Sequence, residues 1–155
     1  MSSSPPSLYE WAGGERAFRT LFTRFYERVA EDPLLAPVFA GMDPRHAEHV
    51  AAFVGEVMGG PAHYSTEHGG HAAMLRKHLD RMLDQPKRKR WIALLLDCAD
   101  DVGLPDDPEF RSAFVSYLEW GSRLAVINSQ PGVDVTLDAP MPAWGWGEVK
   151  GPYTP

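Results

Sequence analysis

Residues 18–29, FRTLFTRFYERV, carry the pattern that decides the fold class. The apolar side chains recur at i, i+3, i+4, i+7, i+8 and i+11, which places them on one face of an α-helix. These positions are Phe18, Leu21, Phe22, Phe25, Tyr26 and Val29. Asp32-Pro33 follows, and the residue before proline disfavours helical dihedral angles, so we expect the helix to end there.

The same helical spacing continues toward the C-terminus between Gly and Pro breakers. Asp43-Pro44 is typical of an N-cap with proline at the first helical position, and Gly59-Gly60-Pro61 is typical of a helix end. We expect further helices at about residues 71–83, from Pro86 to Gly103, and at about residues 107–128. The alternation at residues 133–137 is short and isolated, so the predicted fold class is all-α.

The length of 155 residues fits one domain. We expect a disordered lead at residues 1–7, a helical domain at residues 8–128 and an extension at residues 129–155. The extension is rich in Pro, Gly and Trp, so it cannot form regular helix. It holds too many tryptophans for a solvated linker, and we expect it to pack on the domain.

Composition excludes several classes of function. With 15 basic and 21 acidic residues the formal charge is −6, which argues against a nucleic-acid partner. The basic run at residues 87–90 is expected to be a solvated helix start. A single cysteine permits no internal disulfide, no stretch has the apolar length of a membrane span, and the N-terminus lacks the features of a signal peptide. We therefore expect a cytoplasmic protein.

All six histidines fall between residues 46 and 78. His63, His68 and His71 lie in or beside a glycine-rich loop and are expected at the surface. No histidine follows a glutamate by three positions, so a carboxylate-bridged di-iron bundle is a poor fit. The chain has neither the cysteines nor the His-x-x-x-His pair of a zinc site.

His78 differs because it shares a helix face with Met74, Leu75 and Met82. A lone histidine on an apolar face is more often a core residue than a ligand. However, Tyr26, Trp91 and His46 bring polar tips to the apolar faces of three other helices. A flat apolar cofactor with an iron centre would use all four groups.

The ordered motifs resemble the truncated haemoglobins, in particular group II, which keeps a tryptophan in the distal pocket. The resemblance runs from about Leu8 to Asn128. Its marks are Gly13-Gly14, Arg24-Phe25-Tyr26, Phe39, Gly59-Gly60-Pro61, Tyr64-Ser65, Gly70-His71, His78 and Trp91.

The resemblance implies a two-over-two helical sandwich around haem b (iron protoporphyrin IX). It makes His78 the proximal iron ligand and Tyr26 and Trp91 the distal hydrogen-bond donors. It places His46 on the distal helix, facing the ligand entrance, with the direction of its ring left open. The remaining implied haem contacts are Phe39 on the haem face, Val50 and Phe53 on the distal wall, Met74 and Met82 on the proximal side, His49 near the haem edge, and Tyr64, Arg76 and Lys77 at the propionates.

The expected function is binding of O2, CO or NO at ferrous iron trans to His78, for oxygen binding or the scavenging of reactive gases. The alternative is a haem enzyme, an NO dioxygenase or a peroxidase-like protein. The chain has no flavin or nicotinamide motif, so turnover would need an external reductase as partner. A third interpretation is an all-α interaction domain without a cofactor.

Overall fold

The computed structural model describes residues 4–152, which form eight α-helices and one short three-ten helix. No strand occurs within these residues, so the predicted all-α class is confirmed. The elements are α1 (Leu8–Ala12), α2 (Gly14–Val29), α3 (Ala36–Phe39), α4 (His46–Val57), α5 (His63–Glu67), α6 (Gly70–His78), α7 (Gln85–Asp101), α8 (Pro108–Asn128) and η1 (Gly147–Val149).

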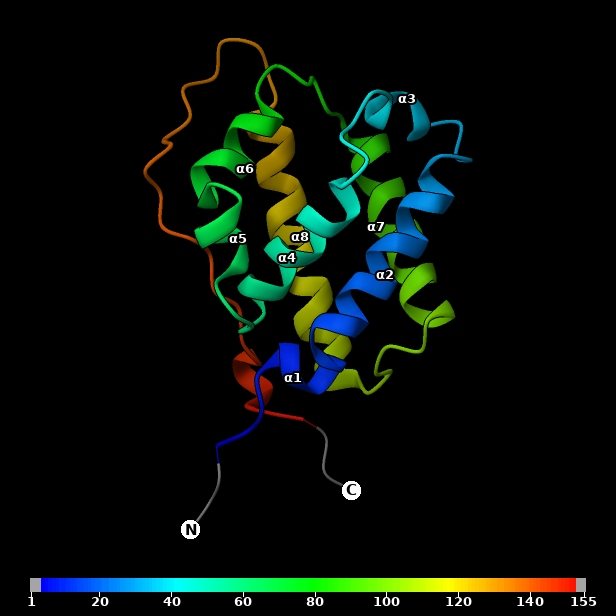
Figure 1. The fold of residues 1–155 in the computed structure, drawn as a ribbon, viewed down its shortest axis with the longest axis vertical. Coiled ribbons are helices and arrows are strands. Elements are labelled where there is room, and N and C mark those ends of the chain that lie inside the picture. The colour runs from blue at the N-terminus through cyan, green and yellow to red at the C-terminus, as the bar shows by residue number, and fades with distance from the viewer. Residues whose placement is uncertain (1–3, 153–155) are drawn as a thin grey trace.

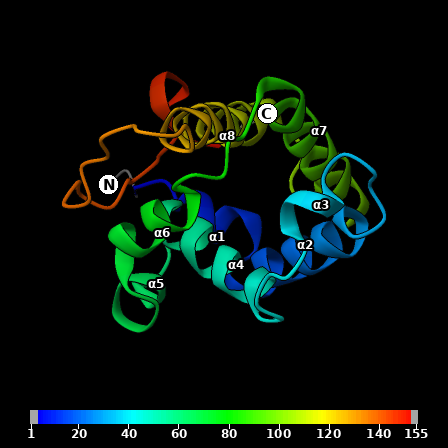
Figure 2. The same cartoon turned by 90° about the horizontal axis from the view of Figure 1, so that it is seen from above.

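The long helices form two layers. Helix α2 packs against α4 in one layer and against α7 of the other, and α7 packs against α8. Figure 2 shows the pair α7–α8 above the pair α2–α4, with α5 and α6 beside them. This is the two-over-two arrangement that the resemblance implies.

Aromatic residues fill the space between the layers. Phe18, Phe22 and Phe25 of α2 are fully buried, as are Phe110 and Phe114 of α8, whose rings stack at 5.6 Å. The apolar face predicted for residues 18–29 is therefore the face that packs on the core. Burial of each such side chain contributes roughly 1.5–3 kcal/mol to folding.

Side-chain caps set several helix ends where the sequence predicts breakers. The carboxylate of Asp32 accepts hydrogen bonds from the backbone of Leu34 and Leu35 at 3.1 Å and pairs with Arg90 at 2.6 Å. Asp84 caps α7, and Asp107 caps α8 while accepting the indole N–H of Trp11 at 2.9 Å. These caps satisfy backbone donors that a helix start leaves free.

Two predicted helix boundaries are wrong. Helix α6 ends at His78 rather than near residue 83, because Asp80 and Met82 adopt φ angles of 58° and 52°, outside the helical region. Helix α4 begins at His46 rather than at Pro44, because Asp43 caps a turn by accepting from the backbone N–H of Arg45 at 2.7 Å.

The chain ends lie close to the domain where they are described. The predicted lead is described only from residue 4, and there Ser7 caps α1 while Pro6 accepts the indole N–H of Trp146 at 2.8 Å. The backbone N–H of Trp144 donates to Val57 at 2.8 Å. No helix within residues 4–152 has the length and apolar character needed to cross a bilayer.

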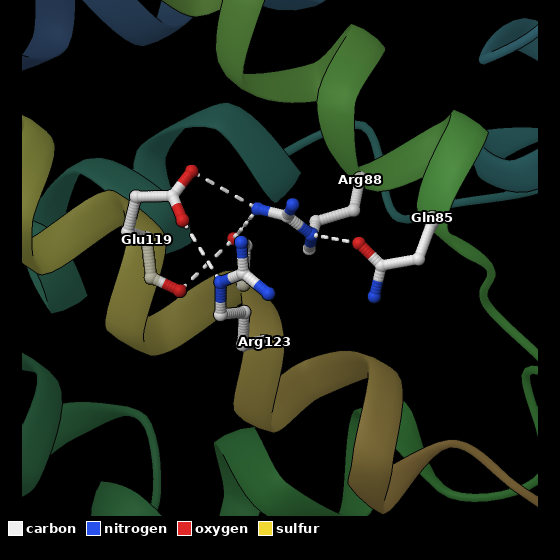
Figure 3. Close-up of polar contacts among 5 residues, drawn as sticks. Gln85, Arg88, Glu119 and Arg123 are labelled. Carbon is white, nitrogen blue, oxygen red and sulfur yellow. Dashed lines mark hydrogen bonds and ion pairs between the residues drawn. The ribbon is translucent and has the colours of Figure 1, made fainter.

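The predicted solvated helix start at residues 87–90 is wrong for Arg88, which is only 5% exposed. Its guanidinium donates to Gln85 at 2.7 Å and to Glu119 of α8 at 3.1 Å, and Arg123 donates to the other oxygen of Glu119 (Figure 3). This network joins the first turn of α7 to the middle of α8. Arg88 lies one helical turn before Trp91, on the side of α7 that faces α8. Its side chain therefore points toward α8 rather than toward solvent.

Replacing Arg88 by Met is expected to lower the free energy of unfolding by about 1–2 kcal/mol in a urea titration. The loss stays below the roughly 3–5 kcal/mol of a broken fully buried pair, because the Glu119 side chain is 43% exposed and keeps Arg123. The matched control is Arg123→Met, a change at an exposed residue of the same network, expected to cost under about 0.5 kcal/mol. Equal losses in the two variants would contradict the structural role given to Arg88.

Candidate functional site

His78 is the last residue of α6, and its ring orientation is fixed by a hydrogen bond. Its Nδ1 lies 2.9 Å from the carbonyl oxygen of Met74. A carbonyl only accepts, so the proton is on Nδ1 and Nε2 keeps its lone pair. Burial lowers the pKa of His78, which favours the neutral ring. A neutral imidazole with a backbone-bonded Nδ1 is the form in which histidine ligates a metal.

An aromatic cluster brings together residues from four other helices, α2, α3, α4 and α7. Tyr26 of α2 lies 4.8 Å from the ring of His46 and 5.4 Å from that of Phe39. Phe25 lies between Tyr26 at 4.9 Å and Trp91 at 5.5 Å. The helices that carry Tyr26 and Trp91 lie across the molecule from α6 in both views (Figures 1 and 2).

The polar tips of this cluster meet each other. Nε2 of His46 lies 3.2 Å from the Tyr26 hydroxyl oxygen, so the ring of His46 points inward, a direction that the sequence left open. Burial raises the pKa of Tyr26, while the indole of Trp91 acts in the opposite direction. Burial, followed by the nearby cation Lys77, lowers the pKa of His46 to about 4. Both groups are therefore neutral at neutral pH.

This assignment predicts a pH effect on the haem-free protein. The pKa of His46 falls from its usual 6.5 in the unfolded chain to about 4 in the fold, so between these values the unfolded chain binds the extra proton. The contribution of neutral His46 to the free energy of unfolding is complete above pH 6.5 and is lost as the pH falls toward 4. Replacing His46 by Leu should reduce the drop between pH 7 and pH 5 by about 2 kcal/mol in urea titrations. An unchanged drop would contradict the buried neutral state of His46.

One cavity joins His78 to the aromatic cluster. His49, Tyr64, Arg76 and Met82 do not line it, but the other predicted haem contacts and distal residues do: Tyr26, Phe39, His46, Val50, Phe53, Met74, Lys77, His78 and Trp91. Residues of α8, among them Leu118 and Ala125, close it on a further side. The described structure thus brings the four polar groups singled out in the sequence into one space.

Several predicted residues lie elsewhere. Tyr64 is fully buried behind Phe53, with ring centroids 5.1 Å apart, and its hydroxyl has no partner among the described residues. The Met82 side chain is 59% exposed because α6 ends before it, and Arg76 is exposed. The ring of His49 lies 4.5 Å from that of His68, tilted by 45°, and does not line the cavity.

The two remaining histidines of the loop, His63 and His71, have different surroundings. His63 is exposed, as expected, beside Glu67 at 3.8 Å. The expectation of a surface position is wrong for His71, which lines the cavity and lies 3.1 Å from the carbonyl oxygen of Ala139 through Nδ1.

Two cavity cations were not found from the sequence. Arg81 and Lys87 line the cavity together with Lys77, and no Asp or Glu among the described residues lines it. Arg81 was hidden because it follows the end of α6, and Lys87 because it belongs to a run of basic residues. The sequence signal that could have identified Lys87 as a cavity residue is its position one helical turn before Trp91.

The residues present fit haem. The cavity is mainly apolar, its cations match two carboxylate groups, and His78 offers one free imidazole nitrogen. No three His, Cys, Asp or Glu side chains of the described part come together as metal ligands. A metal bound here with one protein ligand requires a macrocycle to supply the rest of its coordination, as in haem proteins.

An all-helical two-over-two sandwich in which His78 faces an aromatic pocket across the cavity defines a globin of the truncated type. A model of the bacterial-like globin family matches residues 7–119, and the chain belongs to this family, whose members bind haem. It is 34% identical to the group 2 truncated hemoglobin YjbI of Bacillus subtilis over 123 residues, covering 79% of this chain and 90% of that protein.

Solved structures give the same class. The truncated oxygen-avid haemoglobin of Bacillus subtilis is 33% identical with a TM-score of 0.69, covering 78% of this chain and 99% of that one. The thermostable hemoglobin of Thermobifida fusca is 31% identical with a TM-score of 0.68, covering 78% of this chain and 97% of that one. The predicted membership of the group II truncated haemoglobins is confirmed.

Proposed function

We propose that the protein binds O2 in the cavity between His78 and the Tyr26–His46–Trp91 cluster, with CO and NO as further ligands. Haem b, when bound, would supply a ferrous iron that can take such a diatomic gas. In this proposal His78 holds the iron through Nε2. The cations Lys77, Arg81 and Lys87 hold the propionates.

The observation that carries the proposal is the inward hydrogen bond between His46 and Tyr26, 3.2 Å long, in an otherwise apolar cavity. Polar groups gathered in an apolar space serve a ligand that develops charge, and O2 does so when bound. If His46 donates from Nε2 to the Tyr26 oxygen, the Tyr26 hydrogen is free to point at the ligand. The pair then acts as a chain in which each hydrogen bond polarises the next.

Trp91 supplies a second donor, its indole N–H. Replacing Trp91 by Phe removes that donor and keeps most of the ring contact with Phe25, which is 5.5 Å away. We expect O2 to dissociate faster by about tenfold, the effect of one good hydrogen bond. The stability loss should stay below the roughly 3–5 kcal/mol of an aromatic residue cut to Ala. Stopped-flow kinetics and urea titration measure the two; unchanged kinetics with a large stability loss would make Trp91 a plain core residue.

A second proposed use of the site is NO dioxygenation, in which NO, O2 and one electron give nitrate. The observation that favours it is the number of donors around one position, because slow O2 release leaves time for reaction with NO. The electron would come from an external reductase. Repeated NO consumption by the O2-loaded protein with a reductant would support turnover. A single turnover followed by arrest in the ferric state under the same reductant would restrict the protein to binding.

A further inference from the structure

Helix α6 carries the proposed iron ligand, but little of its own structure holds it. It has nine residues, none of them fully buried, and no side chain caps its N-terminus. A helix this short is marginal on its own and depends on tertiary contacts. A metal ligand, however, must be held in a fixed position by its surroundings. Contacts from outside the helix therefore decide where His78 lies.

The C-terminal extension supplies such contacts beyond the end of α6. We call residues 129–146 the strap. Ser129 is fully buried; its carbonyl oxygen accepts from the backbone N–H of Met82 at 2.8 Å, and its hydroxyl oxygen accepts from that of Leu83 at 2.9 Å. The side chain of Gln130 donates to the Leu83 carbonyl at 2.9 Å. These bonds fix the segment that directly follows His78.

The strap also holds the first turn of α6. The ring of His71 lies 3.1 Å from the Ala139 carbonyl through Nδ1, and since a carbonyl only accepts, His71 donates. Three residues later, Pro142 lines the cavity. Figure 1 shows this part of the chain, in orange, running beside α6 and α5.

The far end of the strap is tied to the rest of the domain. The backbone of Trp144 donates to Val57 at the end of α4 at 2.8 Å, and its ring lies 5.5 Å from Tyr117 and 5.4 Å from Trp120 of α8. The strap therefore connects both ends of α6 to α4 and α8, two of the helices that line the cavity.

We propose that the strap positions α6 for haem binding, so that its contacts with His71 and with the segment after His78 set how long haem stays in the cavity. The inference rests on the proposed function, because it takes His78 as the iron ligand. The match to the bacterial-like globin family ends at residue 119, before the strap begins. His71, Ser129 and Pro142 thereby become part of the haem site through position rather than through contact with iron.

The test uses the full chain loaded with haem. The double variant His71→Leu/Ser129→Ala removes one side-chain bond at each end of α6. We expect haem transfer to an excess of an apoglobin acceptor to accelerate about tenfold, which corresponds to about 1.4 kcal/mol. The iron–histidine stretching band of the ferrous protein, measured by resonance Raman, should broaden or shift. If the double variant does not fold, His71→Leu alone carries the same test, with the same direction of change.

Two further variants separate positioning from general loss of stability. His71→Asn keeps a donor near the place of Nδ1 and should restore slow haem loss. Trp146→Phe removes the hydrogen bond from the indole N–H to the Pro6 carbonyl oxygen, 2.8 Å long. Because this bond lies on the α1 side of the domain, away from His71 and from the segment after His78, haem loss should stay unchanged. A double variant that releases haem at the rate of the unmodified chain, with an unaltered stretching band, overturns the inference alone. An unmodified chain that takes up no haem overturns the proposed function instead.

Discussion

Replacing His78 by Ala is expected to yield a folded protein that does not retain haem. Substituting a residue that hydrogen-bonds to a metal ligand already lowers metal affinity by about 10–100-fold. Removing the ligand itself should therefore lower haem affinity by more than about 100-fold. No other histidine lies at the end of α6, and His46 is engaged with Tyr26 at 3.2 Å. Haem content after gel filtration and the ferrous absorption spectrum measure the effect, and far-UV circular dichroism checks the fold.

The matched control is His49→Ala, since His49 belongs to the same cluster in the sequence but contacts His68 outside the cavity. It should keep haem. A His78→Gly variant supplied with free imidazole should regain part of the ferrous spectrum, because the small ligand fills the vacated place. An unchanged five-coordinate ferrous spectrum in His78→Ala would show that another residue holds the iron.

Replacing Tyr26 by Phe is expected to accelerate O2 dissociation at least about tenfold, or about 1.4 kcal/mol. The hydroxyl is buried and held by His46, so it keeps its direction without the entropy cost of ordering a mobile side chain. CO accepts hydrogen bonds weakly and should leave at a similar rate in both proteins. Stopped-flow kinetics with both gases measure the difference.

Two variants test whether the effect belongs to the Tyr26 hydroxyl. Tyr117→Phe removes another buried hydroxyl from the cavity wall, on α8, and should leave O2 dissociation unchanged. His46→Ala should alter association rates, because this ring begins α4 beside the solvent-exposed turn at Asp43. It should accelerate O2 release less than Tyr26→Phe does, because it removes the partner of the Tyr26 hydroxyl but keeps the hydroxyl itself. Faster O2 release in His46→Ala than in Tyr26→Phe would reverse the roles of the two residues.

Much of the fold follows from local signals. The apolar period of residues 18–29 and the Asp and Pro residues near helix starts predict α2, α7 and α8 closely, because a helix face and a cap lie within the segment itself. The end of α6 could not be predicted, because Met82 bonds to Ser129, far along the chain. The short α5 was also missed, since five residues among Gly and Pro carry no clear period.

The candidate site, like the fold, could be predicted from the sequence only in part. Periodicity placed Tyr26, Trp91 and His78 on apolar faces, but it was the family resemblance that implied they share one pocket. The partner of His46 required the structure, because sequence spacing cannot decide which of two directions a ring takes at a helix start. Arg81 was missed for the same reason as Met82: the segment after α6 leaves helical geometry.

The claim central to all of this is that the cavity holds one haem through His78. The most direct measurement is the absorption spectrum of the purified full chain, titrated with haem, reduced, and then exposed to CO. The expected result is a Soret band that saturates at one haem per chain, a five-coordinate ferrous form, and a clear shift of the band when CO binds. A titration with no saturable Soret band, or a ferrous protein whose spectrum CO does not change, would contradict the account.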